Sequence, residues 1–202
     1  MTTKNAENRL QEQLKFLQII DKEKQVFRQT LLMDGSRCEN DAEHSWHMAV
    51  CAMLLYEYCD ERDSLSMERV LRMVLLHDLV EIGAGDTYAY DTAGNQTKSQ
   101  REQEAAEHLF SVLPPDQGPD FRRLWEEFEA CLTPEARFAR MADTFMPFYH
   151  NYITKGTQWR IHGVHAPQVE KRLERIKSSS LFLWEFCRRL LDEAVEKGYL
   201  LP

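Results

Sequence analysis

The sequence predicts an all-α fold, and three observations support that prediction. Apolar residues recur three and four positions apart along most of the chain, which is the spacing of an amphipathic helix. Residues that favour helix starts, such as serine, threonine and asparagine, precede several of these segments. No segment shows a convincing alternation of apolar and polar residues, so no strand is expected. With 202 residues, 43% of them hydrophobic, the chain is expected to form one domain.

The first expected helix covers about residues 6–20. Three leucines spaced i, i+4 and i+7 fall on one face of this helix, namely Leu10, Leu14 and Leu17. The following residues, 21–40, contain Asp34-Gly35-Ser36, a typical turn composition. We therefore expect residues 21–40 to be mainly a loop.

The next two helices are expected to begin at recognisable caps. A second helix begins near Asp41, because Asn40 or Asp41 can serve as its N-cap. Ser66 is a candidate N-cap for a third helix, whose apolar residues lead into an adjacent histidine and aspartate. Gly83 is expected to end this third helix. Residues 83–97, rich in glycine and aspartate, are expected to form an ordered loop beside a site.

Five further helices are expected in the second half of the chain. One ends at Pro114-Pro115, and a shorter one follows. Thr133-Pro134-Glu135 is a strong start for the next, because threonine caps, proline suits the first helical position and an acid favours the helix dipole. Gly156 can close that helix. Two more helical segments are expected at about 167–178 and 180–197.

Composition and charge exclude several classes of function. The formal net charge of −8, spread along the chain, disfavours binding to long nucleic acid, although a small phosphorylated ligand remains possible. The five cysteines include no Cys-x-x-Cys pair, so we expect reduced thiols. The N-terminal residues lack the apolar core of a signal peptide, and no run approaches the roughly 20 apolar residues of a membrane span. We therefore expect a cytoplasmic protein that does not bind membranes.

Four potential metal ligands stand far apart in the sequence, at His44, His77-Asp78 and Asp143. Imidazole and carboxylate together suit a divalent transition metal and leave coordination positions for water and substrate. His77-Asp78 and Asp143 lie within apolar runs, where buried polar groups need partners. The alternatives are a solvent-exposed His-Asp pair and, for Asp143, an ion pair with an arginine such as Arg140.

These ligands belong to a set of motifs that resembles a known family. The motifs are Glu43-His44-Ser45, His77-Asp78-Leu79-Val80-Glu81, Gly85-Asp86 and Asp143. Together they make the chain similar to the HD-domain metal-dependent phosphohydrolases, and in particular to the branch of bacterial 5′-deoxynucleotidases and HD domain-containing protein 2. The resemblance implies a single helical HD domain over residues 1–202. Its motif-bearing core would cover about 27–152, and about 157–202 would form a C-terminal helical extension.

The resemblance also implies roles for individual residues. One divalent ion, which could be Mn, Co, Fe, Ni or Zn, would be bound by His44, His77, Asp78 and Asp143. Glu81, one helical turn after His77, is the candidate to orient the attacking water or accept its proton. Asp86 is the candidate to protonate the leaving 5′-oxygen or to fix the sugar, with a structural turn as its alternative. Arg28 and Arg37 are candidates to bind phosphate, or else solvent-facing arginines.

The implied reaction is release of phosphate from a nucleoside 5′-monophosphate, with a deoxyribonucleotide expected. Gln29-Thr30 follows Arg28, whereas that branch usually has a tryptophan there that is thought to exclude the ribose 2′-hydroxyl; selectivity between the sugars stays open. One alternative is hydrolysis of guanosine tetraphosphate, although Ile82 stands where those enzymes usually have a second acid. Another is a metal-stabilised nucleotide-binding regulator without turnover. A homodimer is expected, and the apolar residues 184–191 are either its candidate surface or part of the core.

Overall fold

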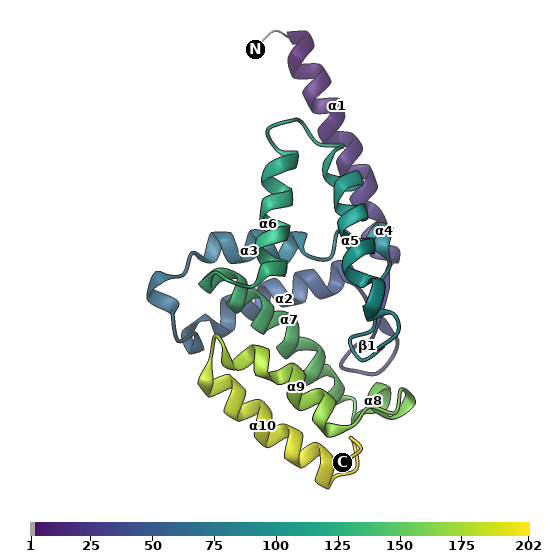
Figure 1. Cartoon of the computed structure of the whole chain (residues 1–202), viewed down its shortest axis with the longest axis vertical. Coiled ribbons are helices and arrows are strands. Elements are labelled where there is room, and N and C mark those ends of the chain that lie inside the picture. Colours follow the sequence, from purple (N-terminus) through teal and green to yellow (C-terminus); the bar gives the residue numbers. More distant parts are fainter. Residues whose placement is uncertain (1–2) are drawn as a thin grey trace.

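The computed structural model describes residues 3–202, which are mainly helical (Figure 1). Its α-helices are α1 (Thr3–Ile20), α2 (Asp41–Leu55), α3 (Met67–Leu76), α4 (Glu81–Ala84), α5 (Asn95–Phe110), α6 (Gly118–Ala130), α7 (Pro134–Ile153), α8 (Thr157–Ile161), α9 (Ala166–Lys177) and α10 (Leu181–Glu196). Short 3-10 helices are η1 (Asp21–Gln25), η2 (Tyr56–Tyr58) and η3 (Arg62–Ser64), and the two strands are β1 (Phe27–Leu31) and β2 (Cys38–Asn40). The predicted all-α class is confirmed.

The expectation that residues 21–40 are mainly a loop, without strands, is wrong. The segment forms η1 and then the antiparallel hairpin β1–β2, with an irregularity in its register. Thr30 is the one buried residue of β1, so the strand lacks the apolar alternation by which strands are recognised. The predicted turn does occur between the strands, where Gly35 adopts a φ of 74° and the Asp34 side chain accepts a 2.9 Å hydrogen bond from the Ser36 amide.

Helix starts follow the predicted caps. Asn40 and Glu43 form a capping box at the start of α2, with hydrogen bonds of 2.9 and 3.1 Å. Ser66 and Thr133 accept hydrogen bonds from backbone amides of α3 and α7. These caps fix where α2, α3 and α7 begin, and hence the rotation at which each presents its polar residues to the interior.

The end of the third helix differs from the prediction. Helix α3 stops at Leu76, a turn follows over residues 77–80, and the short α4 comes next. Gly83 lies inside α4, and a Cβ atom built there would stand 3.2 Å from the Ala105 Cβ, so this glycine permits close packing of α4 on α5. Gly85, with a φ of 76°, ends α4 instead.

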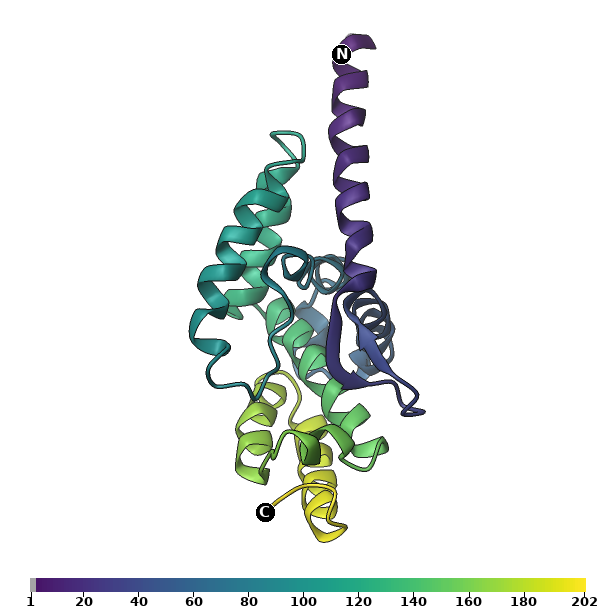
Figure 2. The same ribbon diagram turned by 90° about the vertical axis from the view of Figure 1, so that its right-hand side faces the viewer.

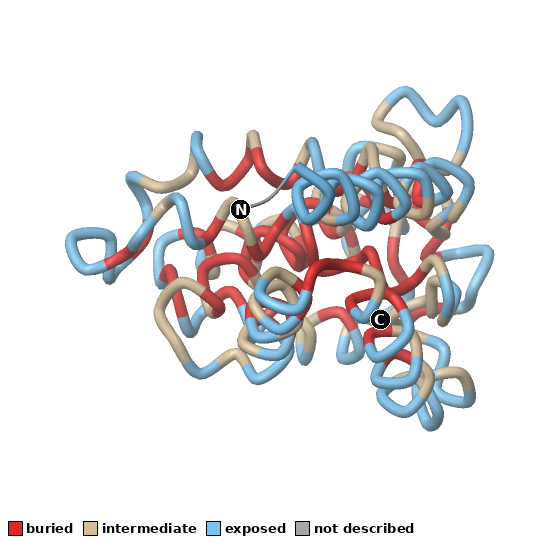
Figure 3. The backbone as a smooth tube through the Cα atoms, turned by 90° about the horizontal axis from the view of Figure 1, so that it is seen from above, coloured by how far each residue is buried: buried red, intermediate tan, exposed pale blue. Residues whose placement is uncertain are grey.

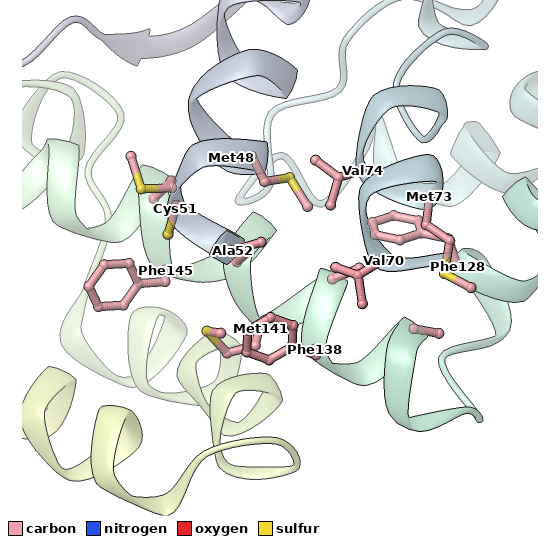
Figure 4. Packing of buried hydrophobic residues seen from close by; sticks show 14 of the residues in the cluster. Met48, Cys51, Ala52, Val70, Met73, Val74, Phe128, Phe138, Met141 and Phe145 are labelled. Atoms are coloured by element: carbon pink, nitrogen blue, oxygen red, sulfur yellow. The ribbon is translucent and has the colours of Figure 1, made fainter. Parts of the chain in front are cut away.

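The core is built around α7. This helix packs against α2, α3, α6 and α9, and α10 packs on α9. Buried side chains from α2, α3, α6 and α7 interdigitate in the middle of the molecule, as Figure 4 shows for Met48, Val74, Phe128, Phe138 and Phe145. Figure 3 shows the buried segments gathered in the interior, with exposed helices around them. This packing holds α2, α7 and the end of α3 rigidly beside one another.

Helix α1 lies apart from this core. It extends toward one end of the long axis, while α10 lies at the other end (Figures 1 and 2). Phe16 is the buried residue of α1 and contacts Phe121 edge-on, with ring centroids 5.9 Å apart. The predicted leucine face, by contrast, is largely exposed. Within residues 3–202, no helix combines the length and the apolar character required to cross a membrane.

Candidate metal centre and active-site cavity

The predicted ligands come from three elements that the core holds together. His44 lies in the first turn of α2, His77 and Asp78 lie in the turn after α3, and Asp143 lies in the middle of α7. All four residues are buried. Donor atoms of His44, His77 and Asp143 all lie within 4.8 Å of one another. The fold therefore brings together residues that are up to 99 positions apart in sequence (143 − 44).

Asp78 lies beside this group of three. Its Oδ2 atom is 3.0 Å from Nε2 of His77 and 4.0 Å from Nε2 of His44. Oδ1 of Asp143 is 3.4 Å from Nε2 of His44 and 3.9 Å from Nε2 of His77. The Asp78 carboxylate is also paired with Nη1 of Arg28 at 2.7 Å. The alternative partner of Asp143, Arg140, is present too, with Nη1 at 3.5 Å from Oδ2.

The histidine environments suit metal binding. Nδ1 of His77 lies 2.8 Å from the Val74 carbonyl, so Nδ1–H donates to that oxygen and Nε2 faces the group; in the neutral ring this Nε2 carries the lone pair. Nδ1 of His44 lies 3.4 Å from Oε1 of the buried Glu39. Both Nε2 atoms are buried without a hydrogen-bond partner of acceptable geometry. Metal-binding histidines commonly show this arrangement, with one nitrogen held by an oxygen and the other left for the ion.

The surroundings of this group favour the ionised forms of its two carboxyl groups. Burial alone would raise the pKa of Asp143, but the adjacent His44 imidazole, 3.4 Å away, and the charge of Arg140 hold it well below its usual value. Burial likewise opposes ionisation of Asp78, and the charges of His77 and Arg28 outweigh it and lower its pKa. Two carboxylates ionised at neutral pH, together with the imidazoles, form a suitable donor set for a divalent cation.

A second group of carboxylates lies next to the first. Oxygen atoms of Asp41, Glu81 and Asp86 lie within 4.8 Å of one another. Burial, followed by the charge of Asp78, raises the pKa of Asp41 to about 8 and raises that of Glu81 well above its usual value. Burial also raises the pKa of Asp86. The mutual repulsion of these acids is partly balanced by Arg28, whose Nη1 lies 3.1 Å from Asp41.

Lys98 of α5 supplies a second cation to these acids. Its Nζ lies 3.2 Å from Oε1 of Glu81 and 2.9 Å from Oε1 of Glu102. Oε2 of Glu81 is buried and has no hydrogen-bond partner. One oxygen of Glu81 is thus held in place while the other stays available.

Both groups open on one cavity of about 490 Å³, a volume typical of small-ligand sites. It is enclosed by β1, the residues around α4 and the loop after it, α5, α7 and α9. Arg28, His77, Asp78, Glu81, Asp86 and Asp143 all contribute to its lining. Three of the four predicted metal ligands, the two candidate acids and one predicted phosphate-binding arginine therefore line a single chamber, and His44 lies behind its lining against Asp143.

One sequence candidate, Arg37, lies elsewhere. Arg37 does not line the cavity; its guanidinium is half exposed and binds the Glu43 carboxylate through two hydrogen bonds of 2.8 and 2.6 Å. His47, which stands one turn after His44, has its ring 5.4 Å from that of His150 and is not part of the ligand group. Arg28, by contrast, is a cavity residue, and Gln29 and Thr30 line the cavity beside it.

Several cavity or supporting residues were not predicted from the sequence. Glu39 supports His44, and Asp41, interpreted from the sequence as a cap candidate, is fully buried against Arg28. Lys98 lies in a polar stretch of α5, where an i, i+4 Lys-Glu pair normally faces solvent. The position of Glu39 directly before the predicted Asn40 cap, and so close to His44 in sequence, was the signal that could have indicated it. No local signal distinguishes Lys98.

The fold and the buried histidine–aspartate centre define the class of the protein. The model of the HD domain family matches residues 20–183, and the chain belongs to this family.

Two proteins named as 5′-deoxynucleotidases are similar to this chain in sequence. The human 5′-deoxynucleotidase HDDC2 is 32% identical over 131 residues, which cover 64% of this chain. The chain spans 62% of the length of that human relative. The fission yeast 5′-deoxynucleotidase hdd1 is 25% identical over 190 residues, covering 92% of this chain and 85% of the yeast protein.

Solved structures are similar over a larger part of the chain. A predicted metal-dependent phosphohydrolase from Magnetospirillum magnetotacticum is 50% identical, with a TM-score of 0.91 and 96% of both chains covered. A protein from Pyrococcus horikoshii, 19% identical with a TM-score of 0.61, covers 91% of this chain and 99% of its own and shares the fold.

Proposed function

We propose that the protein is a divalent-metal-dependent phosphohydrolase that releases phosphate from nucleoside 5′-monophosphates, deoxyribonucleotides among them. The observation that carries this proposal is the buried group of His44, His77 and Asp143, in which both imidazole Nε2 atoms lack a hydrogen-bond partner and of which His77 and Asp143 line the 490 Å³ cavity. The names of the human, yeast and Magnetospirillum relatives support it.

His44, His77, Asp78 and Asp143 would hold one divalent ion. Manganese, cobalt, iron, nickel and zinc all accept imidazole and carboxylate ligands. When bound, such an ion supplies a Lewis acid for the phosphate and lowers the pKa of water. Glu39 would support His44 as a carboxylate behind a metal-binding imidazole.

Arg28 is the residue that would bind the substrate phosphate. Its side chain is largely buried, and neighbouring carboxylates, Asp78 first among them, keep its pKa well above its usual value despite burial. A guanidinium that is always charged and presents several N–H groups suits a phosphate better than a point charge would. Its position between Asp41 and Asp78 places it next to the proposed ligands.

Glu81 and Asp86 would carry the proton transfers. Glu81 has one oxygen held by Lys98 and one without a partner, so it can orient a water molecule and accept its proton. Asp86 lies in the loop after α4 and lines the same cavity, where it can donate a proton to the leaving 5′-oxygen or bind the sugar.

Phosphate release from metal-stripped protein resupplied with manganese, cobalt or zinc tests this function. The substrates are ribo- and deoxyribonucleoside 5′-monophosphates, 3′-monophosphates and guanosine tetraphosphate. We expect turnover of 5′-monophosphates that depends on added metal. This turnover should be lost in His77→Gln and retained in His108→Gln, a control at an exposed histidine. Turnover of guanosine tetraphosphate alone would replace this function with the alternative hydrolase, and nucleotide binding without turnover would indicate a regulator.

We also propose a homodimer located in the cytoplasm. The predicted surface on α10 is only partly available, because Cys187 and Leu191 are buried and the Trp184 ring is covered by the Lys177 ammonium at 4.4 Å. Phe182, which is 55% exposed, is the larger apolar side chain left at the start of α10. Light scattering should give twice the chain mass, and a monomer mass at micromolar concentration would refute the dimer.

A further inference from the structure

One wall of the cavity carries arginines that the proposed chemistry does not use. Arg172 and Arg175 stand three residues apart on α9, so their side chains leave the same side of that helix. Both line the cavity, as does Arg140 of α7. Helix α9 packs against α7 through its buried residues Val169 and Leu173, which fixes the two arginines beside the Asp143 side of the cavity.

The three arginines differ in their partners. Arg140 is fully engaged: Nη2 donates 2.8 Å to Glu129, Nη1 lies 3.5 Å from Asp143, and the guanidinium stacks over the Phe128 ring at 4.0 Å. Within residues 3–202, by contrast, the guanidinium groups of Arg172 and Arg175 form neither an ion pair nor a hydrogen bond. Glu170, the nearest acid on α9, pairs with Arg188 of α10 instead.

Electrostatics make this wall a place for an anion. Burial, followed by the charges of Arg172 and Arg140, lowers the pKa of Arg175, although an arginine remains protonated at neutral pH. Like charges gathered without counter-ions raise the free energy of the empty cavity. Asp143 would offset part of this charge, but its carboxylate is a proposed ligand of the metal. Binding of a negatively charged group next to α9 would relieve the repulsion.

This wall is separate from the position of Arg28. Arg28 enters from β1 and contacts Asp41 and Asp78, whereas Arg172 lies close enough to affect Tyr88, Tyr90 and Asp143 electrostatically. The cavity lining therefore includes one arginine from β1 and two from α9, and the two sets have different carboxylate neighbours. A monophosphate offers one strong anion, which can satisfy one of these sets.

We propose that Arg172 and Arg175 select substrates that carry a second phosphoryl group in addition to the phosphate held at the histidine–aspartate centre. This inference rests on the proposed phosphohydrolase function and specifies a second anionic group on its nucleotide substrate. Two kinds of nucleotide offer the required chemistry. A nucleoside 3′,5′-bisphosphate carries the second phosphate on the sugar, and a nucleoside 5′-diphosphate carries it on the first phosphate.

The test compares the kcat/KM for phosphate release from deoxyadenosine 5′-monophosphate, 3′,5′-bisphosphate and 5′-diphosphate, using the full metal-loaded chain. The products are identified so that the position of cleavage is known. The wild-type protein should prefer one of the doubly phosphorylated substrates. Arg172→Gln and Arg175→Gln should each reduce that preference about tenfold, which is typical for losing a charge-assisted hydrogen bond. Lys171→Gln, an exposed neighbour on the same helix, is the matched control and should keep the wild-type preference.

Two results would overturn the inference: equal kcat/KM values of the wild type for all three substrates, or equal losses in the variants for mono- and bisphosphate. The second result would mean that these arginines bind the phosphate being released or only support the fold; circular dichroism melting separates those two cases. Absence of turnover on every substrate would refute the proposed function instead. Calorimetric binding of the bisphosphate and the monophosphate to wild-type and doubly substituted protein would then decide the inference on its own.

Discussion

The two sides of the cavity are built on opposite principles. On one side, Asp41, Glu81 and Asp86 come from separate elements, are largely buried and share the cations Arg28 and Lys98. On the other side, Arg172 and Arg175 stand together on the single helix α9. Arg172 is half-buried and Arg175 is exposed, and neither forms an ion pair with a carboxylate within residues 3–202. Charge is thus compensated internally on the first side and uncompensated on the second.

This difference separates chemistry from recognition. Groups that hold an ion or move protons must keep a fixed geometry, which burial and internal pairing provide. Groups that recognise a ligand gain most when the ligand itself supplies the missing charge. Substitutions on the carboxylate side should therefore change metal content or kcat, and substitutions on the arginine side should change the choice among substrates. The largest effects are expected on the carboxylate side.

Asp78→Ala should have the largest effect. It removes a proposed metal ligand whose carboxylate lies 3.0 Å from His77 Nε2 and leaves the positive charge of Arg28 less compensated. We expect loss of bound metal, measured by elemental analysis, and activity at background. Asp63→Ala, at a fully solvated side chain, is the matched control. Full metal occupancy in Asp78→Ala would show that this carboxylate is not a ligand.

Glu81→Gln should separate metal binding from turnover. The amide keeps the size of the side chain but cannot accept a proton, so the metal should remain while kcat falls by about 10²–10⁴, the usual contribution of a general base. Elemental analysis and steady-state kinetics measure the two quantities. Glu68→Gln, on the exposed face of α3, serves as the control. A variant with normal kcat would remove Glu81 from the proposed mechanism.

Glu39→Gln should have an intermediate effect. The Glu39 carboxylate lies 3.4 Å from Nδ1 of His44, and its replacement should weaken metal affinity by about 10–100-fold, as is typical of partners behind metal-binding histidines. Competition with a chelator measures the affinity. Glu43→Gln is a demanding control, because Glu43 precedes His44 directly but binds Arg37 and the Asn40 amide instead. Equal effects of the two substitutions would point to the stability of α2 rather than to His44.

The sequence singles out the histidine–aspartate group more readily than the residues around it, for a physical reason. His77-Asp78 and Asp143 interrupt apolar runs, and the chain has to place such residues in the interior together with their polar groups. The caps Asn40, Ser66 and Thr133 gave the starts of the helices that carry or precede these ligands. Polar residues within apolar runs and helix caps are local patterns, so they can be recognised in a single sequence.

The arginine side could not be predicted in this way. Arg172 and Arg175 lie in a strongly charged helix whose composition is typical of a solvated surface, and only the packing of α9 on α7 brings them to the cavity. The same holds for α4, whose length of 4 residues is too short to show a helical period, and for β1, which has a single buried residue. Features set by contacts distant in sequence leave little local pattern.

The smallest expected effect concerns a residue that belongs to neither side. Gln29 of β1 lines the cavity next to Arg28, and its Oε1 lies 3.2 Å from Nε2 of His162. Gln29→Trp introduces the bulky ring expected at this position from the resemblance to the 5′-deoxynucleotidase branch. It should raise the ratio of deoxyribo- to ribonucleotide kcat/KM about tenfold, a magnitude typical of steric discrimination. Gln29→Ala, which loses the contact with His162 without adding a ring, is the control. An unchanged ratio in Gln29→Trp would place sugar discrimination elsewhere in the cavity, with the Asp86 loop as the next element to test.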